Sequence, residues 1–393
     1  MHPESTDRDP TAADTDPLAA RIGAELRALI QAEIKAAGGR LPFDRFMELA
    51  LYAPGLGYYA AGAAKLGPGG DFVTAPELSP LFGQCLANQC AEVLERLGGG
   101  DLIELGAGTG ALAVQILEHL EQLGALPERY RILEPSPDLR ERQRQRIMAS
   151  VPHLSARCDW LERLPSAIQG LLIANEVLDA MPVHRFRVRE DGGTDEIFVV
   201  ADGEGLGEIG APAQSRGLAA AVARLQAEGL ALTPGYSSEI NLRLGPWIEA
   251  LATSLRAGLI LLVDYGYPRA AYYQADRHMG TLMCHHRHRA HDDPYRSIGL
   301  QDITAHVDFS AVAEAARAAG LELHGFTTQA HFLIGCGIDA LLASAADPFE
   351  LAQGAKQLLL PSAMGERFKV IALGSGVAGP WRGFQVRDLG AWL

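Results

Sequence analysis

Cysteine, lysine and long apolar runs are scarce in this 393-residue sequence. The five cysteines are odd in number, scattered and without a C-x-x-C pair, so neither a disulfide framework nor a cysteine zinc site is indicated. No apolar run approaches the roughly 18 residues that a membrane-spanning helix needs. The formal net charge is −14, which argues against binding to duplex nucleic acid, because that binding depends on neutralising phosphates. The chain has only four lysines, which argues against a polybasic membrane anchor. A small-molecule substrate or a basic protein partner is favoured instead.

The first hundred residues predict a helical cap on a larger domain. Residues 1–17 are polar and acidic and contain no apolar or arginine-rich targeting pattern, so we expect a disordered tail and a cytoplasmic protein. Apolar residues recur at helical spacing over 18–37 and again after Pro42, while the stretch 54–76 is rich in glycine and proline. The expected organisation is a tail (1–17), a helical cap with a glycine-rich lid (18–100), a core (101–375) with an insertion at about 183–235, and a C-terminal tail (376–393).

From residue 101 onward, short apolar runs alternate with helical patterns. This alternation predicts parallel strands that are covered by helices on both faces. An inserted hairpin is expected where apolar and polar residues alternate around Asp191-Gly192-Gly193. The predicted fold class is α/β, a doubly wound, seven-stranded, Rossmann-like sheet with an N-terminal cap and a substrate-side insertion. Among the expected strands are 101–105, about 130–134, 154–157, 171–174, 259–264, 321–328 and 367–373.

Three glycines stand between the first of these strands and the helix that follows it. Gly106, Gly108 and Gly110 would let backbone N–H groups approach a nucleotide-like ligand closely. The spacing also satisfies the dinucleotide fingerprint G-x-G-x-x-A, so an NAD-type oxidoreductase is one interpretation. Glu104 would repel a pyrophosphate but could face a cationic amino acid group. Since the sequence also lacks the Tyr-x-x-x-Lys pattern of one common hydride-transfer apparatus, S-adenosylmethionine is the favoured cofactor.

Polar side chains are also expected at the ends of later strands and along one extended segment. Glu134, Asp159 and the pair Asn175-Glu176 follow successive strands, as a cofactor lying across the carboxyl edge of the sheet requires. Polar and apolar residues alternate from residue 302 to residue 309. If this segment is extended, one face carries Asp302, Thr304, His306 and Asp308.

Five ordered blocks stand out along the chain: Gly70–Gly83, Glu104–Gly110, Ala174–His184, Val263–Gly266 and Asp302–Phe309. Together they resemble the MidA-like class I methyltransferases, over about residues 20–375. The bacterial and mitochondrial members of that family share S-adenosylmethionine as cofactor, and the mitochondrial members look like protein arginine methyltransferases that assist the assembly of respiratory complex I. The resemblance therefore implies a methyltransferase fold, a protein partner, which could be a respiratory complex subunit, and transfer to arginine nitrogen.

The resemblance also implies roles for single residues. The methionine part of the cofactor would be held by Glu104 and the three glycines, the ribose hydroxyls by Glu134 and the adenine amino group by Asp159. Thr74 would close over the cofactor, and Asn175 with Glu176 would occupy the position where such enzymes hold the methyl acceptor.

An arginine acceptor makes a further chemical demand. Its guanidinium has a pKa above about 12 and must be oriented by carboxylates and lose a proton as the methyl arrives. Glu176, Asp302 and Asp308 could supply the carboxylates, and the His306 imidazole could accept the proton.

Two other interpretations remain at this point: the NAD-type oxidoreductase, and a non-enzymatic assembly factor that retains a cofactor pocket. No metal site is expected, because methyl transfer needs none and arginines interrupt the histidines of the segment 285–293.

Overall fold

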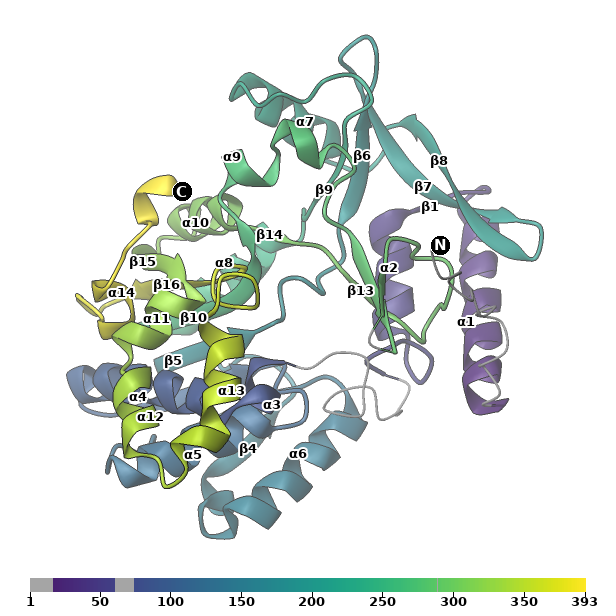
Figure 1. Ribbon diagram of the computed structural model, residues 1–393. Helices are drawn as coiled ribbons and strands as arrows, with labels where there is room; N and C mark the ends of the chain where they lie inside the picture. Colours follow the sequence, from purple (N-terminus) through teal and green to yellow (C-terminus); the bar gives the residue numbers. More distant parts are fainter. Residues whose placement is uncertain (1–16, 61–73, 288) are drawn as a thin grey trace, which may run out of the picture.

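The computed structural model describes residues 17–60, 74–287 and 289–393. Residues 1–16 of the expected tail 1–17, most of the expected lid and His288 lie outside the described residues, and Pro17 begins a helix. A large sheet forms its centre (Figure 1). Seven strands follow one path in the order β15-β16-β10-β5-β2-β3-β4, and the short β14 also pairs with β10. Only β16 runs against its neighbours on this path. The strands are β2 (Asp101–Leu105), β3 (Tyr130–Leu133), β4 (Cys158–Leu161), β5 (Ile168–Asn175), β10 (Leu255–Tyr267), β14 (Val307–Asp308), β15 (Glu322–Thr328) and β16 (Phe368–Ser375).

Helices cover both faces of this sheet, which confirms the predicted doubly wound α/β fold. One apolar cluster joins the sheet to α4, α5, α6, α11, α12 and α13, and a second joins its other face to α8 and α10. Burial on both faces explains why β5 and β10 are almost wholly apolar. The helices of the first cluster are α4 (Pro80–Leu97), α5 (Ala111–Gln122), α6 (Pro137–Ser150), α11 (Gln329–Gly335), α12 (Ile338–Ser344) and α13 (Pro348–Leu359), and those of the second are α8 (Leu244–Ser254) and α10 (Phe309–Ala318).

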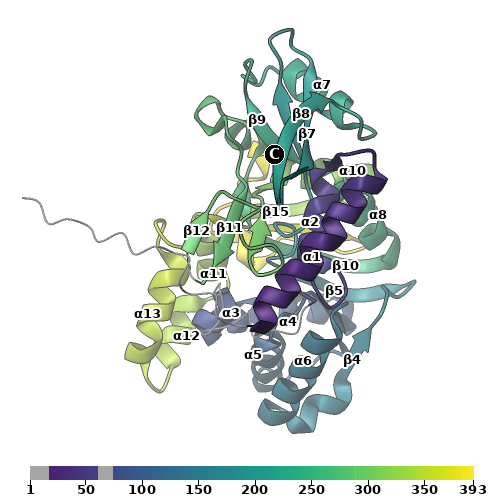
Figure 2. The same cartoon turned by 90° about the vertical axis from the view of Figure 1, so that its right-hand side faces the viewer.

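A second sheet unites the N-terminal segment with the insertion. Its order is β1-β7-β6-β9, with β8 on the other side of β7, and the predicted hairpin around Asp191-Gly192-Gly193 is present as β6 and β7. The helices α1 and α2 pack beside β7 in both views (Figures 1 and 2). These elements are α1 (Pro17–Ala36), β1 (Leu41–Pro42), α2 (Phe43–Tyr52), β6 (His184–Val188), β7 (Thr194–Asp202), β8 (Gly205–Pro212), α7 (Leu218–Ala227) and β9 (Ser237–Ile240).

A small sheet of order β12-β11-β13 stands between the cap and the core. It brings the histidine-rich segment beside the segment that begins at Asp302, with His285 opposite Asp302. Its strands are β11 (Met283–His286), β12 (Arg289–His291) and β13 (Asp302–Thr304). The remaining helices are the short α3 (Ala75–Leu78), α9 (Arg269–Tyr272) and α14 (Arg382–Gln385).

The strand predicted at 154–157 is wrong. Pro152–Arg157 forms a 3₁₀ helix, and the strand β4 begins only at Cys158. The proline at the first position of that turn has no N–H to donate to a sheet. Within the described part of the chain, no helix combines the length and apolarity that a membrane span would need.

Candidate active site

A cavity of about 1010 Å³ opens at the carboxyl edge of the large sheet. The ends of β2, β3, β5 and β10 supply one wall, and α3, α8, β13 and two tyrosines of the cap region supply the others. In open α/β sheets ligands bind at this edge, where the strand order reverses. The predicted residues Thr74, Glu104, Gly106, Gly108, Glu134, Asn175, Glu176 and Asp302 all line this cavity.

The glycine turn has the backbone that only glycine adopts readily. Gly106, Gly108 and Gly110 have φ values of 67°, 53° and 81°. A Cβ on Gly106 would lie 3.1 Å from Val177 Cγ2, so a side chain there would press on the turn after β5. Gly110 does not line the cavity itself but precedes the first turn of α5. The turn thus presents bare backbone at a helix N-terminus.

Two buried carboxylates lie beside the glycine turn. Glu104 accepts a hydrogen bond of 2.6 Å from the Tyr130 hydroxyl, and burial raises its pKa to about 7. Glu134 accepts from the Ser136 N–H at 3.0 Å and from Gln143 Nε2 at 3.2 Å, and burial raises its pKa too. Buried carboxyls of raised pKa ionise readily beside a cation and accept hydrogen bonds from hydroxyls.

A second acidic part of the cavity, its acidic end, is built on the turn that follows β5, which lies beside Gly106 of the glycine turn. Glu176 has a φ of 54°, a strained value for a residue with a side chain. The Asp264 carboxylate holds this turn, because its Oδ2 accepts from the N–H groups of Val177, Leu178 and Asp179 at 3.2, 2.9 and 3.3 Å. Such strain persists where surrounding contacts fix the backbone, and it is common at functional sites.

Several buried oxygens of this turn have no hydrogen-bond partner among the described residues. They are Asn175 Oδ1, Glu176 Oε2 and Asp179 Oδ1, and all three residues line the cavity. Burial, with the Asp179 charge as the next cause, raises the pKa of Glu176 to about 8. Unpaired buried acceptors are costly, so their convergence indicates a ligand that donates hydrogen bonds.

The third side of this end comes from the cap region and β13. The Tyr59 hydroxyl donates to both oxygens of Asp302, at 2.9 and 3.0 Å, and the Tyr59 ring stacks on Tyr52. Tyr265 and His285 complete the wall. The described residues of the cavity wall include no lysine and no arginine, whereas seven carry a carboxyl group: Glu77, Glu104, Glu134, Asp138, Glu176, Asp179 and Asp302.

The prediction that Asp302, Thr304, His306 and Asp308 share one face is wrong for its second half. Asp302 and Thr304 line the cavity, but the strand β13, which pairs with β11, ends at Thr304, and β14 pairs with β10 instead. The His306 ring instead packs against Tyr265 and Tyr267, at ring-centre distances of 5.0 and 5.4 Å. It lines a separate cavity of about 420 Å³, and burial lowers its pKa to about 4. The structure therefore does not bring the imidazole to the active-site cavity.

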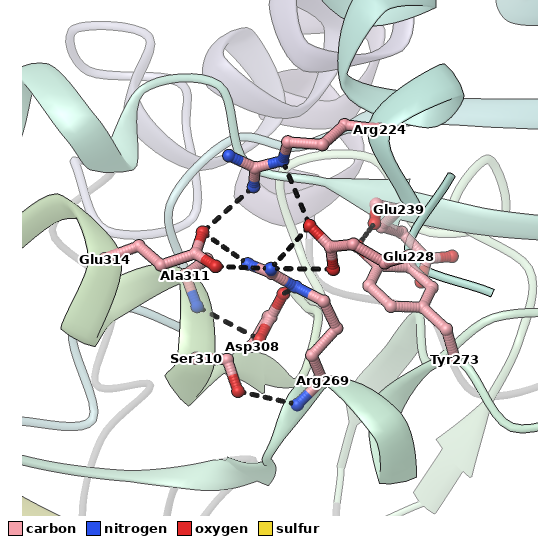
Figure 3. Close-up of polar contacts among 9 residues, drawn as sticks. All are labelled: Arg224, Glu228, Glu239, Arg269, Tyr273, Asp308, Ser310, Ala311 and Glu314. Atoms are coloured by element: carbon pink, nitrogen blue, oxygen red, sulfur yellow. Dashed lines mark hydrogen bonds and ion pairs between the residues drawn. The ribbon is translucent and has the colours of Figure 1, made fainter. Parts of the chain in front are cut away.

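Asp308 is likewise removed from that cavity. Its Oδ1 accepts from the N–H of Ala311, which caps α10, and its Oδ2 accepts from Arg269 Nε at 3.1 Å. Figure 3 shows Arg269 held between Asp308, Glu228 and Glu314, with Arg224 beyond them. This ion-pair cluster joins the insertion to α10, and Asp308 is accounted for as a helix cap and ion-pair partner.

Asp159, like Gly110, His306 and Asp308, lies outside the cavity. It is inside β4 instead of beyond its end, opposite Arg131 of β3, and lines a shallow surface hollow. The cause is the misplaced strand: the carboxyl edge, which a cofactor contacts, comes only after Leu161. Leu133, Leu139 and Leu164 form the apolar wall near this edge.

The sequence patterns did not select several residues of the site. Glu77 accepts hydrogen bonds from Thr109 and from Arg146, which fastens α3 to the glycine turn. Tyr59 and Tyr265 belong to the acidic end, and Tyr265 lies in one of the family-like blocks. Asp179, three residues after Glu176, is a weaker candidate from the sequence, where a role at a helix N-terminus is an equal alternative. Periodicity in the sequence does not identify a residue whose contacts are with residues far away along the chain.

Comparisons with known proteins agree with this geometry. A family model described as an S-adenosyl-L-methionine-dependent methyltransferase matches residues 85–327. A crystal structure from Burkholderia thailandensis bound to S-adenosyl-homocysteine has 42% sequence identity and a TM-score of 0.91, and covers 96% of this chain and 98% of its own.

Curated relatives agree as well. The protein arginine methyltransferase NDUFAF7, mitochondrial, of Danio rerio is 30% identical over 86% of this chain and 84% of its own length. The Homo sapiens protein of the same name is 28% identical over 85% and 80%. These names give no support to the oxidoreductase alternative.

Proposed function

This chain belongs to the S-adenosyl-L-methionine-dependent methyltransferases, and we propose that it is a protein arginine N-methyltransferase. Its cofactor is S-adenosylmethionine, which supplies a methyl group on a cationic sulfonium sulfur. The residues of the cavity fit that molecule: Glu104 would hold the ammonium group, Glu134 the ribose hydroxyls, and the glycine turn would lie along the methionine part. Thr74, at the N-cap of α3, lies at the lip of the same cavity.

The observation that carries the arginine assignment is the set of unpaired, buried acceptor oxygens on the turn after β5. Asn175, Glu176 and Asp179 present only acceptors there, and the described lining offers no lysine or arginine to neutralise them. A guanidinium is planar, cationic and has five N–H donors, so it can satisfy several acceptors at once. The names of the curated relatives support the same acceptor.

For the partner we propose a basic protein, because a chain with a net charge of −14 attracts one. Among such proteins we propose a respiratory complex subunit, on the strength of the resemblance to the MidA-like family. We propose the cytoplasm as the place of action, since all five cysteines are unpaired thiols, as a reducing compartment would leave them.

The proposed function is tested by labelling whole-lysate proteins with radioactive S-adenosylmethionine and the purified chain. We expect label in methylarginine after acid hydrolysis, and loss of that label when the lysate arginines are first blocked with phenylglyoxal. Label in methyllysine would contradict the arginine assignment. The absence of any labelled protein would favour the non-enzymatic assembly factor.

Replacing Glu134 by glutamine is expected to weaken the binding of S-adenosyl-homocysteine on the order of tenfold. One of the two carboxylate oxygens that would accept from the ribose hydroxyls is lost. A charge-assisted hydrogen bond contributes about 1.5 kcal/mol, which corresponds to that change in affinity. Isothermal titration calorimetry measures this change. Asp159→Asn serves as the control and should bind as the unaltered chain does, since Asp159 lies outside the cavity. If Asp159→Asn weakened binding and Glu134→Gln did not, Asp159 would hold the cofactor, as first expected from the sequence.

A further inference from the structure

A second carboxylate, Asp179, points to the acceptor end beside Glu176. It is only 5% exposed, lines the cavity and keeps its Oδ1 without a hydrogen-bond partner among the described residues. A buried oxygen of this kind can take a proton only from something that enters the cavity. A bound guanidinium is such a donor.

The backbone of Asp179 is fixed on both sides. Its N–H donates to Asp264 Oδ2 at 3.3 Å, and its carbonyl oxygen accepts from the Ala305 N–H at 2.9 Å. The turn after β5 is thereby tied to β10 and to the segment after β13. A carboxylate mounted in this way stays in place while a substrate enters and a product leaves.

A tyrosine holds the side chain. The Tyr265 hydroxyl lies beside the Asp179 carboxyl and favours its charged form, which lowers the pKa of Asp179. The Tyr265 ring packs edge-to-face against the rings of His306 and Phe368, with ring-centre distances of 5.0 and 5.4 Å. Tyr265 and Asp179 both line the cavity, and Asp179 Oδ1 remains without a hydrogen-bond partner among the described residues.

We propose that Asp179 accepts the proton that the arginine guanidinium loses on methylation, and that Tyr265 is the positioning residue of Asp179. The proposal rests on the proposed function. The N–CH₃ bond forms as the S–CH₃ bond breaks, and the sulfur keeps the bonding electron pair and becomes a neutral thioether. The methylated nitrogen gives one proton to Asp179 Oδ1, and the proton then passes to solvent as the product leaves.

Glu176 and Asp179 have different surroundings, which suit them to different roles. Burial raises the pKa of both, but the Tyr265 hydroxyl and nearby N–H groups stabilise the charged form of Asp179. Glu176, with Asn175 Nδ2 donating to it at 3.1 Å, is placed to orient the guanidinium. In many active sites, two neighbouring acids have different pKa values because their surroundings differ. One of them can then orient the substrate while the other exchanges a proton. The ionisable groups around Asp179 are Glu176, Asp264, Tyr265, Tyr52 and Tyr59.

The test uses the full chain and the acceptor protein that the labelling experiment identifies. Asp179→Asn should lower kcat on the order of 100-fold, as the loss of a general base does, and change the acceptor KM by less than about threefold. Tyr265→Phe removes a donor to the charged carboxylate, which raises the pKa of Asp179, so the acidic limb of its kcat profile should move to higher pH. Tyr267→Phe is the matched control on the same strand and should leave both quantities unchanged, since Tyr267 does not line the cavity.

The outcomes distinguish failure of the proposed arginine methyltransferase function from failure of the role proposed for Asp179. If the unaltered chain methylates no arginine, the proposed function fails before the variants are made. If the unaltered chain does methylate arginine, two results for Asp179→Asn would overturn the inference. The variant could keep more than a tenth of the kcat of the unaltered chain, or it could lose activity only through a higher KM. If Asp179→Asn does not fold, the pH profile of Tyr265→Phe decides, because a purely structural tyrosine would change the rate without moving the limb.

Discussion

Replacing Glu176 by glutamine is expected to lower kcat/KM for the protein acceptor by about 100- to 1000-fold, the usual cost of removing one charged group that stabilises a transition state. The carboxylate orients the guanidinium, and the neutral amide would present N–H groups to another donor. The binding of S-adenosyl-homocysteine should be unchanged, because the cofactor end is formed by other residues. Radiometric initial rates and calorimetry measure the two quantities.

The pH dependence of the same variant gives an independent check. The pKa of Glu176 is raised to about 8, so below that pH the carboxyl is mostly neutral and must give up its proton to bind a cation. The kcat/KM of the unaltered chain should therefore rise with pH up to about 8 and then level off, and Glu176→Gln should lose this rise.

Linkage gives the sign for stability. An acid whose folded pKa lies above its unfolded value destabilises the fold as pH rises from the unfolded pKa to the folded one. Glu176→Gln should thus melt no lower than the unaltered chain at pH 8, although it is almost inactive. Glu162→Gln, at an exposed position outside the cavity, is the control for both profiles. Retention of half the activity by Glu176→Gln would show that Glu176 does not hold the acceptor.

Replacing Asp264 by alanine is expected to cost about 3–5 kcal/mol of unfolding free energy. Asp264 is fully buried, and its two oxygens accept from four backbone N–H groups: those of Val177, Leu178 and Asp179 on Oδ2 and that of Tyr265 on Oδ1 at 2.9 Å. Each donor left unpaired in the interior costs on the order of 1–3 kcal/mol, and part is recovered if water enters. Urea unfolding followed by circular dichroism measures the change.

Activity should fall together with stability in this variant, because the turn that carries Glu176 and Asp179 loses its anchor. Asp276→Ala removes an exposed carboxylate and should stay within about 0.5 kcal/mol of the unaltered chain. An Asp264→Ala protein as stable and as active as that control would mean that the turn is held by other contacts. Its strained φ at Glu176 would then need a different explanation.

The sheet and the cofactor end could be predicted because their signals are local. A buried strand, a run of glycines and an amphipathic helix follow one another within residues 101–122, and each is written in contiguous residues. Glu104 and Glu134 were found for the same reason, since each stands at the end of a strand that its own sequence defines. A local pattern fails when its boundary is misjudged by a few residues, as the misplacement of Asp159 inside β4 shows.

The acceptor end illustrates what local patterns leave open. Alternation from 302 to 308 predicted four residues on one face, but the pairing with β11 ends at Thr304, and His306 and Asp308 line a different cavity. Tyr59, Asp179, Tyr265 and Asp302 meet there from four separate segments.

For this protein, the sequence by itself determined the doubly wound sheet and the glycine turn, because hydrophobic period and glycine backbone freedom act between residues close in the chain. The glycine pattern admitted two classes of cofactor, and Glu104 with the family-like blocks favoured S-adenosylmethionine. Only the tertiary structure decided which carboxylates face the acceptor. Burial, unpaired oxygens and shifted pKa values arise from contacts between distant segments, and those contacts exist only once the chain has folded.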